Sequence, residues 1–130
     1  MSRANAQRRY QSDGMQSVSP ERLVILLYER VRRDLDEARA AIESGETETR
    51  HNALLHAQQI IEELAYAVQP EVWEGGEGLL ALYDYLLGLL VRANVGSSTA
   101  AIDEAAKIVE ELLGAWRTAY ISLIPAGATA

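Results

Sequence analysis

Two histidines are the residues best suited to metal or phosphoryl chemistry, and both fall within residues 47–68. Glu48 and His51 stand three positions apart, the Glu-x-x-His spacing with which helices of di-iron bundles hold their metals. Such a centre needs two of these pairs and two further inward carboxylates, whereas this chain has one pair, at the start of a helix. We therefore expect no metal and no other cofactor.

The second histidine, His56, has a position from which an exposed imidazole could accept a phosphoryl group in a signalling bundle. The Lys and Gly that usually follow such a histidine are absent, because Ala57, Gln58 and Gln59 come next. We favour an ordinary solvated histidine and keep phosphotransfer through His56 as the alternative function. If both histidines are solvated, replacing His51 and His56 by Gln leaves folding and binding unchanged.

The remaining groupings that could support catalysis lack the necessary geometry. Adjacent carboxylates such as Glu62 and Glu63 diverge around a helix and do not converge on a substrate. Gly75, Gly76 and Gly78 lack both the lysine and the preceding strand of a phosphate-binding loop. We expect a binding protein and not an enzyme.

Composition excludes further classes of function. The 130 residues suit one domain, and 48% of them are hydrophobic and 24% charged, so the chain can bury a core. A net charge of −7 disfavours nucleic acid and anionic membrane surfaces as partners. The chain has no cysteine, and its most apolar run, Leu79 to Val91, is interrupted by Asp84 and too short to cross a bilayer. We expect a soluble, cytoplasmic protein without membrane insertion.

Four long amphipathic helices with short connections predict an all-α fold, an antiparallel four-helix bundle. Ser19 and Pro20 are a typical N-cap and first helical residue, and Gly45 is a typical helix stop. Pro70 closes the second helix because the residue before a proline disfavours helical geometry. The expected helices span residues 20–43, 47–68, 77–94 and 98–121.

The segments outside the helices set the domain boundaries. We expect an N-terminal arm over residues 1–18, the bundle over 19–121 and a frayed C-terminal tail over 122–130. The arm is polar apart from a few side chains such as Tyr10, which either hangs free or docks on a groove of the bundle.

One face of each helix carries the residues expected in the core. On the last helix this face includes Trp116, which we expect to be largely buried. The third helix is apolar over roughly two-thirds of its circumference, more than a surface helix needs. The apolar residues outside the expected core faces are Ile25 and Leu26 on the first helix and Leu80, Tyr85, Leu87, Leu89 and Val91 on the third. They pack centrally or in a homodimer, or they line a groove for a partner helix or extended segment.

Four groups of residues form an ordered set between positions 10 and 120. They are Tyr10 with Ser19-Pro20, Leu23 and Leu27-Tyr28-Glu29; Ala57 to Leu64; Glu74-Gly75-Gly76-Glu77 with Leu82-Tyr83-Asp84-Tyr85 and Ala93-Asn94; and Leu112 to Trp116. This set resembles the FliS family of flagellar export chaperones, and the order makes the resemblance specific although each group alone is weak. Gly88 departs from the family, whose members usually have a polar or basic residue there.

The resemblance implies a helical bundle that binds the C-terminal segment of newly made flagellin in hydrophobic grooves in the cytoplasm. Holding that segment blocks premature polymerisation and helps to deliver flagellin to an export-gate component of the flagellar secretion apparatus. Family members have an N-terminal arm that can cover a groove, and Tyr10 matches the arm tyrosine. Together with the surplus apolar surface, the resemblance gives as candidate partner-binding residues Tyr10, Ile25, Leu26, Leu80, Tyr85, Leu87 and Val91.

Overall fold

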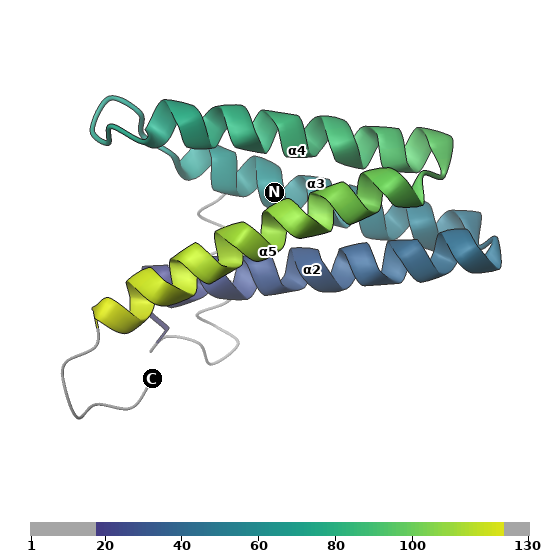
Figure 1. Ribbon diagram of the computed structural model, residues 1–130, viewed down its shortest axis with the longest axis horizontal. Helices are drawn as coiled ribbons and strands as arrows, with labels where there is room; N and C mark the ends of the chain where they lie inside the picture. The colour runs from purple at the N-terminus through teal and green to yellow at the C-terminus, as the bar shows by residue number, and fades with distance from the viewer. Residues whose placement is uncertain (1–17, 124–130) are drawn as a thin grey trace.

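The computed structural model describes residues 18–123, which form four α-helices packed side by side (Figure 1). α2 spans Pro20–Ser44, α3 Thr47–Ala67, α4 Gly76–Gly96 and α5 Thr99–Ser122. The predicted all-α class is confirmed, and each predicted helix agrees with an observed one to within two residues at either end. Tyr10 and most of the predicted arm and tail lie outside the described residues.

The ends of α2 follow from local chemistry. The hydroxyl oxygen of Ser19 accepts a hydrogen bond from the backbone N–H three residues on, at 3.1 Å, and Pro20 occupies the first helical position. At the other end Gly45 has a φ of 75°, in the left-handed region that costs glycine nothing. This conformation lets the Glu46 N–H donate to the Ala41 carbonyl at 2.8 Å, which satisfies one of the last free carbonyls of the helix.

The four helices form a ring in which chain neighbours are also neighbours in space. α2 packs against α3 and α5, and α4 packs against the same two helices from the opposite corner. The contact of His51, early in α3, with Asn94, late in α4, and the contact of Arg39, late in α2, with Asp103, early in α5, place the start of one helix beside the end of its neighbour, so neighbouring helices are antiparallel. The core is filled mainly by aliphatic side chains and two tyrosines, and its largest fully buried members include Tyr28, Tyr83, Ile25, Leu35, Leu54, Ile61, Leu86, Leu89 and Leu90.

Two surplus residues belong to this core, so their predicted place outside it is wrong. Ile25 is completely buried. It lies seven residues before Arg32 and fourteen before Arg39, and both arginines pair with α5, so Ile25 faces α5 as well. Leu89 is also completely buried, one turn after Tyr85, whose hydroxyl bonds Glu104 of α5. Each helix in the ring buries a wider arc than a single stripe because it packs against two neighbours.

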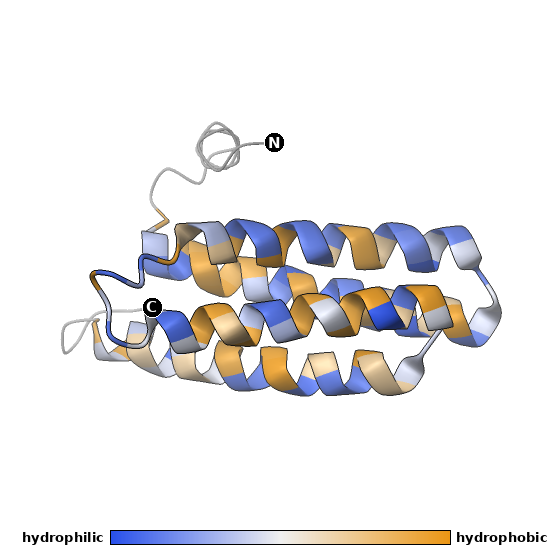
Figure 2. Ribbon diagram, turned by 90° about the horizontal axis from the view of Figure 1, so that it is seen from above, coloured by the Kyte–Doolittle hydropathy of each residue, from blue (hydrophilic) through white to orange (hydrophobic). Residues whose placement is uncertain are grey.

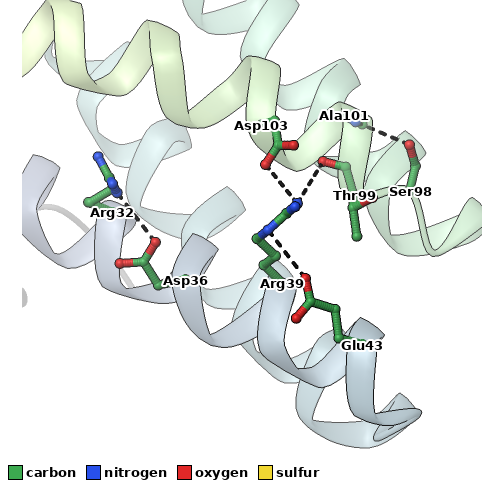
Figure 3. Close-up of polar contacts among 8 residues, drawn as sticks. All are labelled: Arg32, Asp36, Arg39, Glu43, Ser98, Thr99, Ala101 and Asp103. Atoms are coloured by element: carbon green, nitrogen blue, oxygen red, sulfur yellow. Dashed lines mark hydrogen bonds and ion pairs between the residues drawn. The ribbon is translucent and has the colours of Figure 1, made fainter.

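A polar rim closes the outer edge between α2 and α5 (Figure 3). Arg39 contacts Asp103 at 2.7 Å across the interface and Glu43 at 3.5 Å on its own helix. Arg32 reaches Glu110 across the interface and Asp36 within α2. These exposed ion pairs fix the register of the two helices more than they stabilise them, since each contributes at most about 1 kcal/mol.

α5 diverges from α4 towards its C-terminal end (Figure 1). The contact between Tyr85 and Glu104 sets the register of this antiparallel pair, and the start of α4 at Gly76 therefore falls opposite residue 113 of α5. Trp116 lies beyond that point. It is partly buried and packs against the core, which is less burial than the sequence predicted, because no turn of α4 remains to cover it.

Among residues 18–123, α4 is the one helix long and apolar enough to cross a membrane by length and composition. The apolar run considered in the sequence, Leu79 to Val91, is shorter than α4, which extends beyond it at both ends. Core helices of bundles meet the same criterion. In this structure α4 contributes Tyr83, Leu86 and Leu90 to the core.

Candidate functional site

The first histidine lies at the α3–α4 interface, close to the turn that joins α4 to α5. The Nδ1 atom of the exposed His51 is 3.0 Å from the side-chain amide nitrogen of Asn94, and Arg50 donates to the oxygen of the same amide at 3.0 Å. Within the described part of the chain, no three His, Asp or Glu side chains form a group that could hold a metal ion. Asn94 thus joins α4 to the start of α3 through both the nitrogen and the oxygen of its side-chain amide.

The second histidine is tied to a buried carboxylate, so its interpretation as an ordinary solvated residue is wrong. His56 Nδ1 lies 2.6 Å from Asp34 Oδ2 across the α2–α3 interface, and Arg30 Nε lies 3.3 Å from the other carboxylate oxygen. The Asp34 side chain is only 2% exposed, and burial raises the pKa of its carboxyl group because the charged form loses its hydration. The Asp34–His56 contact is therefore an interhelical polar link, and it occupies one nitrogen of the proposed phosphoryl acceptor.

A second polar pair lies in the middle of the bundle. The hydroxyl groups of Tyr28 on α2 and Tyr83 on α4 hydrogen-bond to each other across the diagonal of the ring. Burial raises the pKa of both tyrosines, so both stay protonated. Paired in this way, the two hydroxyls satisfy each other inside an otherwise apolar core.

The predicted partner-binding residues have different surroundings in the structure. Leu80 and Leu87 are partly buried, and Leu87 packs against the core. Val91 and Tyr85 are exposed by 48% and 47%. Leu26 is partly buried on α2, the helix diagonal to α4. Tyr10 lies outside the described residues, and Ile25 is in the core.

The structure brings three of these residues together on the side of α4 that faces α3. The Asn94 contact with His51 sets the register of this antiparallel pair, so one turn forward on α3 matches one turn back on α4. Leu55, one turn after His51, therefore lies beside the turn that contains Leu87 and Val91. Leu55 is 40% exposed and was missed from the sequence. We name Leu55, Leu80, Leu87 and Val91 the α3–α4 apolar surface.

Further exposed apolar residues occur outside this surface. Val72 and Trp73 lie in the connection between α3 and α4, where Trp73 packs over Gly75 so closely that a side chain at that position would meet its ring. Ile121 and Leu123 are exposed at the end of α5. No spacing marks these residues in the sequence, because each owes its exposure to where a helix ends. Figure 2 looks onto α4 from outside the bundle, and hydrophobic residues recur along its whole length.

Comparison with known proteins gives a consistent result. The family described as flagellar protein FliS matches residues 3–122 of the chain. A flagellar secretion chaperone FliS of Bacillus subtilis is 30% identical over 113 residues, which cover 87% of this chain and 84% of the relative. The flagellar secretion chaperone FliS of Salmonella typhimurium is 31% identical over 105 residues, which cover 78% of this chain and 76% of the relative.

Proposed function

The chain belongs to the FliS family, and from this premise we propose that it is a flagellar export chaperone that binds the C-terminal segment of flagellin. The α3–α4 apolar surface is the observation that carries the proposal. A chaperone acts by binding, so the proposal contains no catalytic step. Phosphotransfer through His56 is not proposed, because the relatives of this chain are flagellar secretion chaperones.

The α3–α4 apolar surface has the form that an amphipathic segment requires. It follows the line between two antiparallel helices, so a client helix laid along it can place residues at i, i+3 or i+4, and i+7 against successive turns. Leu55 and Val91 are exposed enough for a client helix to cover them. Leu87 lies between them and the core, against which it packs. A client segment that is disordered alone gains the apolar contacts that offset the entropy lost when it folds on binding.

The remaining candidate residues extend this proposal around the bundle. Tyr85 and Leu26 lie away from the α3–α4 apolar surface, so a segment that contacts them must wrap around more than one face. Tyr10 and the arm are proposed to cover a groove when the client is absent. The acidic charge of the chain suits a cytoplasmic protein that keeps an aggregation-prone client soluble and delivers it to the export gate.

The test is titration of the full-length chain with a flagellin C-terminal peptide, followed by calorimetry. Leu55→Glu places a charge on the α3–α4 apolar surface at a partly exposed position, so it should weaken peptide binding by about tenfold or more. The melting temperature should change little, because Glu is a good helix former and Leu55 is not in the core.

Ile121→Glu is the matched control, because Ile121 is an exposed apolar residue at the far end of α5. It should bind the peptide as the wild type does. Leu87→Glu is a poorer probe than Leu55→Glu, since Leu87 packs against the core and its loss affects folding as well. Unchanged affinity for Leu55→Glu would place the client on another face.

A further inference from the structure

The outward face of α4 carries a second pattern of residues, which shares Val91 with the α3–α4 apolar surface. Ala81, Asp84, Gly88, Val91 and Val95 are all exposed and recur at alternating spacings of three and four. This spacing puts them in one line along the helix, the seam by which two helices pack together. We call these five residues the outer seam of α4. Val95, exposed by 85%, lies at its C-terminal end.

Gly88 lies at the centre of the outer seam, where a glycine weakens the helix compared with alanine. A side chain added there would meet nothing within 4 Å, so no neighbour inside the described chain requires its absence. A glycine on an exposed helix face does allow the backbone of another helix to approach closely. A second helix packed on the outer seam can therefore come closest to the α4 backbone at Gly88.

The residues on either side of Gly88 are complementary to one another under a two-fold rotation. If a second α4 lies antiparallel with the axis at Gly88, a residue four positions before Gly88 meets the residue four positions after it in the other copy. Asp84 then faces Arg92 of the second copy, and the reverse pair forms by symmetry. Both residues are exposed, and within their own helix they are about 12 Å apart, too far to pair with each other.

The apolar residues are also paired by this two-fold rotation. Tyr85, three positions before Gly88, meets Val91, three positions after it, and Ala81 meets Val95 in the same way. The large side chains Tyr85 and Val91 are about half exposed, so a second helix can cover both. No residue of the outer seam meets a like charge in this arrangement.

From this self-complementarity we infer that the protein forms a homodimer in which two α4 helices pack antiparallel about Gly88. An interface made by a single helix pair is smaller than the roughly 1,600 Å² of a standard protein–protein interface. The dimer is therefore reversible and concentration-dependent. The second copy is the occupant because the Asp84 and Arg92 pairs need a partner that carries both charges in this spacing.

The dimer has a consequence that rests on the proposed function. It covers Val91, which also belongs to the α3–α4 apolar surface, so dimerisation and client binding compete. The test of the dimer itself uses the chain without any client, and its outcome is independent of whether flagellin is the client.

The experiment is sedimentation equilibrium of the full-length chain over a wide range of concentration. The wild type should dimerise. Asp84→Arg and Arg92→Asp should each weaken the dimer by about tenfold or more, because each creates two like-charge contacts across the two-fold axis. The double variant Asp84→Arg/Arg92→Asp restores both opposite-charge pairs and should recover the wild-type constant to within about threefold. Glu111→Arg, an exposed charge reversal on α5, is the control and should leave the dimer unchanged.

Gly88→Leu separates the interface from the fold. The larger side chain blocks the close approach of the second helix, yet leucine is a better helix former than glycine. The variant should therefore melt at a higher temperature than the wild type and be monomeric. A wild type that is monomeric at every concentration overturns the proposal, and a loss of flagellin-peptide binding in Gly88→Leu would then assign the outer seam to the client. A dimer that survives Gly88→Leu, or that the double charge swap fails to restore, also overturns it.

Discussion

Breaking the contact between His56 and Asp34 should destabilise the bundle although His56 is on its surface. His56→Leu keeps the bulk of the side chain and removes its hydrogen-bonding nitrogens, so the buried Asp34 carboxylate loses the partner at 2.6 Å. Leaving a buried charged group without a hydrogen-bond partner costs about 3 kcal/mol or more. His56 is 43% exposed, and Arg30 remains 3.3 Å from the carboxylate, so solvent and Arg30 reduce the loss to about 1–2 kcal/mol.

Urea denaturation of matched variants measures this loss. His56→Gln keeps a donor that can reach Asp34 and should cost less than His56→Leu. His51→Leu is the control, because His51 is exposed and its partner Asn94 keeps its bond to Arg50; it should stay within about 0.5 kcal/mol of the wild type. Equal stability for His56→Leu and His51→Leu would refute the argument, because the His56–Asp34 contact would then contribute nothing measurable to the free energy of unfolding.

The pH dependence gives an independent check with a defined sign. Burial raises the pKa of Asp34 above its ordinary value of 3.8, so the folded protein keeps this proton to a higher pH than the unfolded chain does. Between the two pKa values the folded state binds more protons, and its stability falls as the pH rises. Asp34→Asn cannot titrate, so the stability of this variant relative to the wild type should rise between pH 3 and pH 7. A relative stability that falls over that interval would show that the carboxylate is favoured in the folded state.

Two further predictions concern the core. Leu86→Ala should lower the free energy of unfolding in urea by about 2–5 kcal/mol, because Leu86 is only 1% exposed and its truncation leaves a cavity. A loss below about 1 kcal/mol would mean that the neighbouring helices close over the cavity. Tyr83→Phe should cost about 1–3 kcal/mol, because it leaves the buried Tyr28 hydroxyl without its partner across the ring. The double variant Tyr28→Phe/Tyr83→Phe should cost less than the sum of its singles, and additive costs would contradict a coupled pair.

The helices and their ends could be predicted from the sequence because their causes are local. A capping serine, a proline in the first turn and a glycine in the left-handed region act within a few residues, so Ser19, Pro20 and Gly45 mark the ends of α2 in the sequence as clearly as in the structure. The apolar periodicity of each helix acts over the same short range. Residues on these apolar faces, such as Tyr28, Leu35 and Leu86, are accordingly buried in the core.

The candidate site could be predicted only in part. The sequence indicated that α4 has more apolar surface than one core face requires, and Val91 and Tyr85 are indeed exposed. It did not separate these two from Leu89, because a helix alone does not reveal on how many sides it has neighbours. Leu55 was missed for the same reason: its exposure matters only because the antiparallel register brings it next to Leu87 and Val91.

The sequence by itself therefore determined the four helices, the caps of α2, the acidic charge and the family, all of which depend on residues close together in the chain or on their order. Only the tertiary structure decided that Ile25 and Leu89 are core, that Trp116 is partly uncovered, and that Asp34 meets His56. Each of these facts depends on which helix lies beside which and on where the neighbouring helix ends. Those positions are set by the packing of the four helices against one another, and no single helix carries that information.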